Sequence, residues 1–409
     1  MTSADSSRSN QRQQRLALSG TAATVVVATM IGMLFAGSTL VTPLYIMYKQ
    51  AFGFSQISLT LIYAVYVIGN FCGLLLFGRL SDQIGRKPVA AAGMMLMIIA
   101  ALVFLSARGI GALYLGRILS GLAISVGVGT GTAWLAELID DESKSRATVI
   151  ATSANFIGLG VAAMIAGVLA EYLPCPLHLP YIVYLLILAI VTILVLMVPE
   201  TVARSRPSIR DVSIHPRISV PPEIRTQFVA PAVTGFGAMA LVGFYAALAP
   251  SLLANELHVT NPAIAGAIFL ELAVFVSGAI LVTRSLSSRT SMLLALVLML
   301  PSVALIVAAQ LATSVVLLIV ATAACAIAAG LGYRGSLQVT NQIAPPDRRA
   351  EIVSSYLICA FAGNALPVIG VGVISTLVGP VVASLAFAAT IVIFAATALY
   401  FGARHLPKA

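Results

Sequence analysis

Charged residues are rare in this sequence: Asp, Glu, Lys and Arg together make up 9% of its 409 residues, and His and Cys occur only four times each. The cysteines are widely separated, so their spacing indicates neither a disulfide framework nor a metal site. The sequence contains no His-Glu-x-x-His and no Gly-x-x-x-x-Gly-Lys stretch, the signatures of zinc proteases and of phosphate-binding loops. Its basic residues form no stripe or motif typical of nucleic-acid binding. We therefore expect no cofactor, no metal, no nucleic-acid partner and no enzymatic activity.

Apolar residues are abundant instead. They make up 60% of the chain and give it a mean hydropathy of +1.03, whereas a soluble globular chain is about half apolar and about a quarter charged. A helix that crosses a bilayer needs roughly 20 residues, so the chain has room for about a dozen such helices. We predict an all-α membrane protein whose twelve transmembrane helices lie at 20–47, 57–78, 88–107, 111–138, 147–172, 180–198, 227–254, 262–283, 290–310, 314–342, 350–376 and 379–402.

One long polar stretch, 199–226, interrupts the apolar runs and is rich in arginine and proline. It divides the chain into two six-helix bundles, at 20–198 and 227–402, with polar tails at 1–19 and 403–409. Most of the 23 basic residues fall in the tails, in this linker and in the loops on the same side; Lys49 and Arg108 lie on the other side. Because basic loops stay in the cytoplasm, we expect both termini and the linker to be cytoplasmic.

A charged loop, 78–88, lies between the second and third predicted spans. It reads Gly-Arg-Leu-Ser-Asp-Gln-Ile-Gly-Arg-Lys-Pro, and charged groups of this density do not lie in the hydrocarbon core. The two halves of the chain also resemble each other, since Arg146-Ala147 begins the fifth span and Arg349-Ala350 begins the eleventh. Such repeats are typical of secondary transporters.

With twelve spans, two repeated halves and this loop, the whole chain resembles the major facilitator superfamily of secondary transporters. The resemblance implies that the loop forms a cytoplasmic gate, which docks on the start of the eleventh span. Its partner for Arg86 would be an acid at the end of the fourth span; that acid could instead be a solvated helix end. The residues of this predicted gate motif are Gly78, Asp82, Gly85, Arg86, Lys87 and Glu137.

Two ionisable residues inside the spans are candidates for proton coupling. Arg117 in Arg-Ile-Leu-Ser-Gly resembles the fourth-span arginine of proton-coupled family members, although it could also extend to the outer interface. Glu271 is the only one of the 14 acids deep within a predicted span, and an acid there usually faces a cavity or a partner. Its helix face, with Ala267, Val274 and Gly278, is small enough to pack inward. Alternatively, Glu271 is a protonated side chain that only bonds a neighbouring helix.

Several polar and aromatic residues on the predicted helix faces are candidates for the substrate cavity. For most of them a structural role is the alternative: packing for the aromatic residues, interhelical bonding for the asparagine, and an interface position for the arginine. The predicted cavity residues are Thr42, Tyr45, Ser125, Trp134, Tyr245, Arg334, Gln338 and Asn364.

The resemblance favours a proton-coupled exporter of a drug-like molecule or metabolite, because the spans contain few polar groups for a highly polar substrate. The antiporter signature is only partial, since Ala163 stands where drug antiporters have proline. The alternative is a proton-coupled importer of a metabolite such as a sugar or organic acid. The predicted partners are a small-molecule substrate, protons and the lipid bilayer, for a monomer in a bacterial inner membrane.

Overall fold

The computed structural model describes residues 18, 20–77, 80–139, 144–202, 219–346 and 348–405. Gly78 of the predicted gate motif, both tails for the most part, and most of the predicted linker lie outside these ranges. The described residues contain no strand and form twelve helical spans, which confirms the predicted all-α membrane fold.

The helices of the first bundle extend from residue 21 to residue 197. Their bounds are α2 Thr21–Thr39, η1 Thr42–Leu44, α3 Tyr45–Phe52, α4 Gln56–Ala64, α5 Tyr66–Phe77, α6 Leu80–Ile84, α7 Arg86–Leu105, α8 Ile110–Leu138, α9 Lys144–Tyr172 and α10 Leu179–Met197. The helices of the second bundle follow the linker. Their bounds are η4 Pro222–Ile224, α11 Arg225–Ala247, α12 Ala249–Asn255, α13 Pro262–Val282, η5 Thr283–Ser285, α14 Ser288–Leu311, α15 Val315–Ile343, α16 Arg349–Val378 and α17 Pro380–His405.

Two spans are interrupted at a proline, which has no N–H to donate to the preceding turn. Pro43 lies in the short η1 segment that separates α2 from α3, and Pro250 lies at the start of α12 after α11 has ended. The second span is also divided, at Val65 between α4 and α5. The breaks in the first two spans free backbone carbonyl groups inside the membrane, where another side chain must satisfy them.

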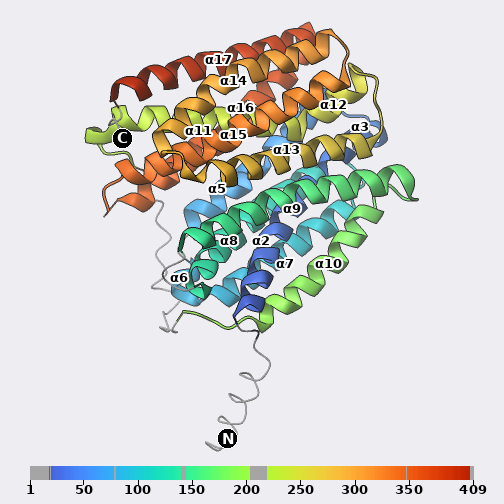
Figure 1. Cartoon of the computed structure of the whole chain (residues 1–409). Helices are drawn as coiled ribbons and strands as arrows, with labels where there is room; N and C mark the ends of the chain where they lie inside the picture. Colours follow the sequence, from blue (N-terminus) through green and yellow to red (C-terminus); the bar gives the residue numbers. More distant parts are fainter. Residues whose placement is uncertain are drawn as a thin grey trace, which may run out of the picture.

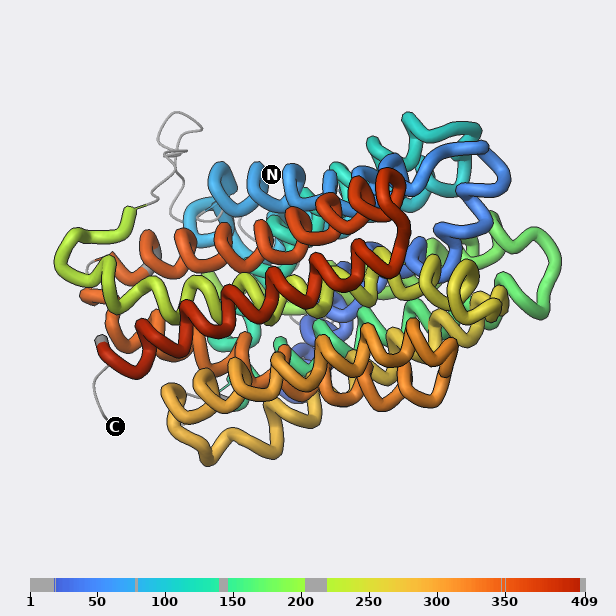
Figure 2. The backbone as a smooth tube through the Cα atoms, turned by 90° about the horizontal axis from the view of Figure 1, so that it is seen from above, coloured from blue at the N-terminus to red at the C-terminus, as the bar shows by residue number. Residues whose placement is uncertain are grey.

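The two bundles lie against each other with their helices running in a common direction (Figures 1 and 2). We call the end that holds the start of α2 the terminal face, and the end that holds α3 and α12 the far face. Helices α9 and α13 lie between the bundles (Figure 1). They approach closely because both have glycines at their contact: a Cβ atom on Gly167 or Gly266 would collide with backbone atoms of the opposite helix.

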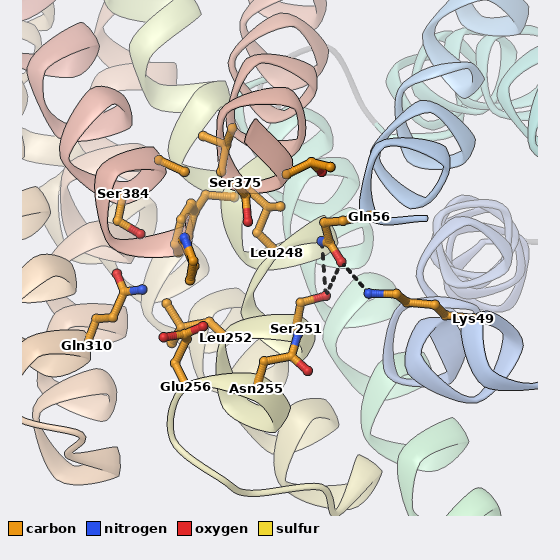
Figure 3. A pocket seen from close by; sticks show the side chains of 15 residues that line it. Lys49, Gln56, Leu248, Ser251, Leu252, Asn255, Glu256, Gln310, Ser375 and Ser384 are labelled. Atoms are coloured by element: carbon orange, nitrogen blue, oxygen red, sulfur yellow. Dashed lines mark hydrogen bonds between the residues drawn. The ribbon is translucent and has the colours of Figure 1, made fainter. Parts of the chain in front are cut away.

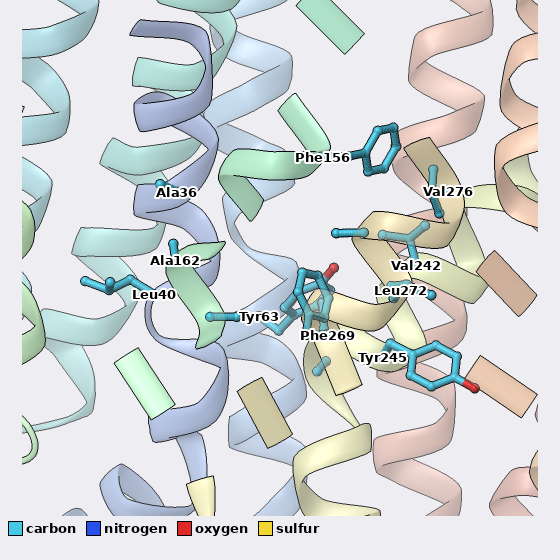
Figure 4. Close-up of a cluster of buried hydrophobic side chains, with 14 of the residues drawn as sticks. Ala36, Leu40, Tyr63, Phe156, Ala162, Val242, Tyr245, Phe269, Leu272 and Val276 are labelled. Atoms are coloured by element: carbon cyan, nitrogen blue, oxygen red, sulfur yellow. The ribbon is translucent and has the colours of Figure 1, made fainter. Parts of the chain in front are cut away.

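The contacts between the bundles are concentrated in the half nearer the far face. There Gln56 Nε2 donates to Ser251 Oγ at 3.2 Å, and Thr60 packs against Gly372 so closely that no Cβ fits at that glycine. Deeper in the membrane, apolar side chains from both bundles, including Phe156 and Phe269, form a shared core (Figure 4). The bundles are therefore joined toward the far face.

Candidate functional site

A cavity of about 100 Å³ lies between the bundles, on the terminal-face side of these contacts. Every long helix that meets the bundle interface contributes to its wall. The lining residues are Phe35, Ser38, Thr39, Tyr63, Tyr66, Asn70, Arg117, Ile124, Asn155, Phe156, Leu159, Met239, Val242, Ala246, Phe269, Tyr333, Leu357, Ala360, Phe361 and Asn364. We call this space the central cavity.

Arg117 is the one charged residue in this wall and is only 2% exposed. Its guanidinium donates to Ser38 O at 2.6 Å and to Tyr63 O at 3.1 Å. These two carbonyl groups belong to the last turns of α2 and α4, where helices present unsatisfied acceptors and the negative end of the dipole. Arg117 therefore stabilises the two broken spans, and its charge is balanced by backbone dipoles.

The rings of Tyr63 and Tyr66 cover Arg117 and also join the bundles. The guanidinium carbon lies 5.1 and 4.8 Å from the two ring centroids, within the range of cation–π attraction. Both hydroxyl groups donate to Asn364 Oδ1 of the second bundle, at 2.6 and 2.8 Å. Asn364 is itself fixed by a bond from its Nδ2 to Met239 O at 3.2 Å. A continuous polar chain thus runs from the first bundle to the second through the cavity wall.

The remaining wall is mainly apolar, with five aromatic residues among its members, and two of its polar atoms are unpaired. Asn70 Nδ2 and Asn155 Oδ1 are buried and have no hydrogen-bond partner within the described ranges. None of the residues that line the cavity is acidic. Phe71 and Phe361, from opposite bundles, meet edge-on with their centroids 6.4 Å apart. These atoms suit a solute that carries one donor and one acceptor group, and at about 100 Å³ the cavity must widen to hold a drug-sized one.

Of the eight predicted cavity residues, the structure places Asn364 in the central cavity and seven elsewhere. Trp134 donates its indole N–H to Pro199 O at 3.1 Å, at the terminal face. Arg334 donates to Thr283 O at 2.5 Å and to Arg284 O at 2.9 Å, so it caps the end of α13 within its own bundle. Gln338 Oε1 accepts from Ser288 Oγ at 3.1 Å.

The other four are packing residues. Thr42 and Tyr45 are almost completely buried where the first span is broken. Tyr245 is buried within the second bundle, and Ser125 occupies the space beside Gly73, between α8 and α5. The sequence of a single helix shows that small or polar residues recur on one face. It does not show whether that face meets the cavity or a neighbouring helix.

Glu271 does not face the central cavity. Phe269 on the same helix lines that cavity, and two residues along an α-helix turn a side chain by about 200°. On the Glu271 face, Val274 is 56% exposed and Ala267 is also exposed. The prediction that this face packs inward is therefore wrong, because the small residues lie on the outer surface of α13 and the large Phe269 lies inside.

The predicted gate residues form a compact ion cluster at the terminal face. Arg86 Nη2 contacts Glu137 Oε1 at 2.6 Å, and Arg86 Nη1 pairs with Asp82 and donates to Ser81 Oγ at 2.7 Å. The expected pair of Arg86 and Glu137 is thus present. The side chain of Asp82 is 58% exposed and pairs with Arg86, so in this conformation its ion pair lies within the first bundle and not on the start of the eleventh span.

Glu200 is a member of this cluster that the sequence did not reveal. Its carboxylate accepts from the backbone N–H groups of Arg86 at 2.8 Å and Lys87 at 3.0 Å, which begin α7. Gly85 has a φ of 117°, and a Cβ there would press against this carboxylate. An acid at a helix N-terminus is favoured by the dipole, but a partner more than 100 residues away leaves no local signal.

The fold and the cavity between two repeated bundles define a transporter. The family model of the Major Facilitator Superfamily matches residues 26–366, so the chain belongs to this family, whose members are transporters and not enzymes. The part of the chain that the structure describes contains twelve helices long and apolar enough to cross a membrane, so this is a multi-pass membrane protein.

Curated relatives match short segments. An uncharacterized transporter of Schizosaccharomyces pombe is 26% identical over 147 residues, which are 36% of this chain and 30% of that one. The multidrug resistance protein MdtL of Escherichia coli O45:K1 is 37% identical over 93 residues, 22% of this chain and 24% of that one. The chain thus spans less than a third of the length of these relatives.

Solved structures match over nearly the whole chain. A bacterial homolog of the human lysosomal transporter Spinster, in an inward-facing and unoccupied conformation, has a TM-score of 0.75 at 13% identity and covers 93% of this chain and 96% of its own. The human organic anion transporter MFSD10 has a TM-score of 0.66 at 14% identity and covers 92% of this chain and 99% of its own. At sequence identities this low, the structural similarity shows that the fold is shared and no more.

Proposed function

We propose that this protein exports neutral or singly anionic aromatic molecules by alternating access, with the terminal face in the cytoplasm. The single observation that supports this substrate class is the wall of the central cavity, which is apolar and partly aromatic, contains no acid and has Arg117 as its one charge. A cationic solute would meet an arginine and no counter-charge. A sugar would need more hydrogen-bond partners than the few polar groups in this wall.

The orientation follows from charge and contact together. Most of the described basic residues of the loops, among them Arg86, Lys87, Arg284 and Arg289, lie at the terminal face, which favours the cytoplasm. The bundles are joined near the far face, so the central cavity lies on the cytoplasmic side of the closure. This is the arrangement that an exporter needs in order to load a solute from the cytoplasm.

We propose that transport is coupled to protons, with Glu271 as the proton carrier. Because Glu271 points away from the cavity, it must act through the position of α13 and not by touching the solute. Arg117 is fully engaged with backbone carbonyl groups, so its part is to hold the two broken spans in place. The ion cluster of Arg86, Asp82 and Glu137 is proposed as the cytoplasmic gate.

The test uses purified protein in proteoliposomes and three fluorescent aromatic dyes of similar size that are neutral, anionic and cationic. We expect saturable transport of the neutral and anionic dyes and none of the cationic dye. Tyr66→Phe removes one hydrogen bond to Asn364 and keeps the aromatic ring. Tyr66→Ala removes the hydrogen bond and the ring, so transport should fall more with alanine. Equal transport of all three dyes, or transport of the cationic dye alone, would contradict the proposed substrate class.

A further inference from the structure

A second pocket, of about 350 Å³, opens at the far face and is separate from the central cavity (Figure 3). Its wall comes mainly from the second bundle, from α12, α14, α16 and α17. Two residues of the first bundle, Lys49 and Gln56, complete its rim. We call it the far-face pocket. Its volume falls within the range of small-molecule sites.

Gln310 at the end of α14 points into this pocket (Figure 3). It is only 4% exposed, and neither its amide nitrogen nor its amide oxygen has a hydrogen-bond partner in the part of the chain that the structure describes. A buried polar group without a partner costs about 1–3 kcal/mol. A leucine would fill the same space without that cost, so the amide indicates a partner that comes from solution.

Three further polar side chains of this pocket are also unengaged. Glu256 lines the pocket, and its carboxylate has no ion pair or hydrogen bond among the contacts that the structure gives for the described residues. The hydroxyl groups of Ser375 and Ser384 line it too and donate no bond within the same ranges. Lys49 Nζ, by contrast, already donates to Gln56 Oε1 at 3.1 Å. Lys49 keeps its positive charge at the rim, while the unengaged groups deeper in the pocket are two hydroxyl groups and one carboxylate.

We propose that the far-face pocket binds a small organic ammonium compound from the solution at that face. The ammonium group would donate to the Glu256 carboxylate, to Gln310 Oε1 and to a serine oxygen. The amide N–H of Gln310 would donate to a hydroxyl or carbonyl group of the same ligand. Phe244 and Leu248 supply an apolar wall for its carbon chain. This chemistry differs from that of the central cavity, whose one charge is positive.

Occupancy of this pocket should also favour the conformation that the structure shows. Ser251 lies in the wall and accepts the bond from Gln56 that joins the bundles. When the bundles separate at the far face, the pocket loses its rim from the first bundle. A ligand that binds the closed form better shifts the protein toward that form.

The experiment measures ethanolamine binding to the full-length protein in nanodiscs by titration calorimetry. We expect saturable binding that weakens about 10- to 150-fold in Glu256→Gln and in Gln310→Leu, the loss expected for one charge-assisted hydrogen bond. The matched controls are Glu171→Gln and Gln50→Leu, which change the same residue types on the same face but outside this pocket; they should bind as the unchanged protein does.

Absence of saturable binding would mean that the pocket holds only water, and it would overturn the proposal, as would equal weakening in the controls. A labelling experiment covers the case in which the pocket variants do not fold. Ser384→Cys, with Cys72 and Cys175 replaced by serine, should react faster with a cationic than with an anionic thiosulfonate, and ethanolamine should slow both reactions. Equal rates with the two thiosulfonates, and no slowing of either reaction by ethanolamine, would refute the site.

Discussion

The bond from Tyr63 and Tyr66 to Asn364 gives a quantitative prediction. Both tyrosine hydroxyl groups donate to the same Oδ1 atom across the bundle interface, and each such neutral bond contributes about 0.5–1.5 kcal/mol. If the bundles separate at this level during the cycle, Asn364→Ala removes about 1–3 kcal/mol from the far-face-closed form alone. The population of the far-face-open form should therefore rise roughly 5- to 150-fold.

The assay is the rate at which a thiol at Thr60 is alkylated from the far face. Thr60 is fully buried against Gly372 in the closed form, so the Thr60→Cys thiol reacts only when the bundles open there. Asn155→Ala is the matched control, since it removes an amide from the same cavity whose oxygen makes no bond within the described ranges. If Asn364→Ala accelerates alkylation no more than Asn155→Ala does, the reasoning is refuted.

Three further predictions concern the gate, the coupling and the orientation. Arg86→Lys and Glu137→Gln should each slow transport. Because the two side chains are in contact, the sum of their effects on the activation free energy should differ from that of the double variant by at least roughly 0.5 kcal/mol; additive effects would show that the two residues do not act together. Glu271→Gln should leave dye binding unchanged and abolish transport driven by a pH gradient, measured with an imposed gradient in proteoliposomes; intact coupling would remove Glu271 from the mechanism. With Cys72 and Cys175 replaced by serine, a thiol in Asn255→Cys should react with an impermeant reagent added outside intact cells, and protection there would reverse the proposed orientation.

The sequence predicts the fold well because bilayer physics imposes long apolar runs and polar ends. The predicted spans and the helices agree to within a few residues for most spans, for example 111–138 against Ile110–Leu138. The contact between Arg86 and Glu137 could also be predicted, since one partner lies in a recognisable loop and the other at a helix end.

The cavity wall was harder to predict because it is assembled from helices of both halves. Arg117 is prominent in the sequence, but its partners are backbone carbonyl groups exposed by breaks in two other spans. Val65, where the second span breaks, is neither proline nor glycine, so nothing in the sequence marks that position. Tyr63 and Tyr66 gain their importance only from Asn364, some 300 residues away.

We propose that this chain carries a solute by exposing one cavity to the two faces in turn. Thr60 and Gly372 face each other across the bundles toward the far face, and a Cβ at Gly372 would lie 2.9 Å from Thr60 Cβ. The Cβ atoms of a disulfide lie about 3.8 Å apart, so only a small shift is needed for a disulfide between Thr60→Cys and Gly372→Cys to lock that face shut. The direct measurement is dye transport by this variant, with Cys72 and Cys175 replaced, under oxidising and then reducing conditions. The account predicts that oxidation stops transport and reduction restores it; transport at an undiminished rate through the cross-linked protein would contradict it.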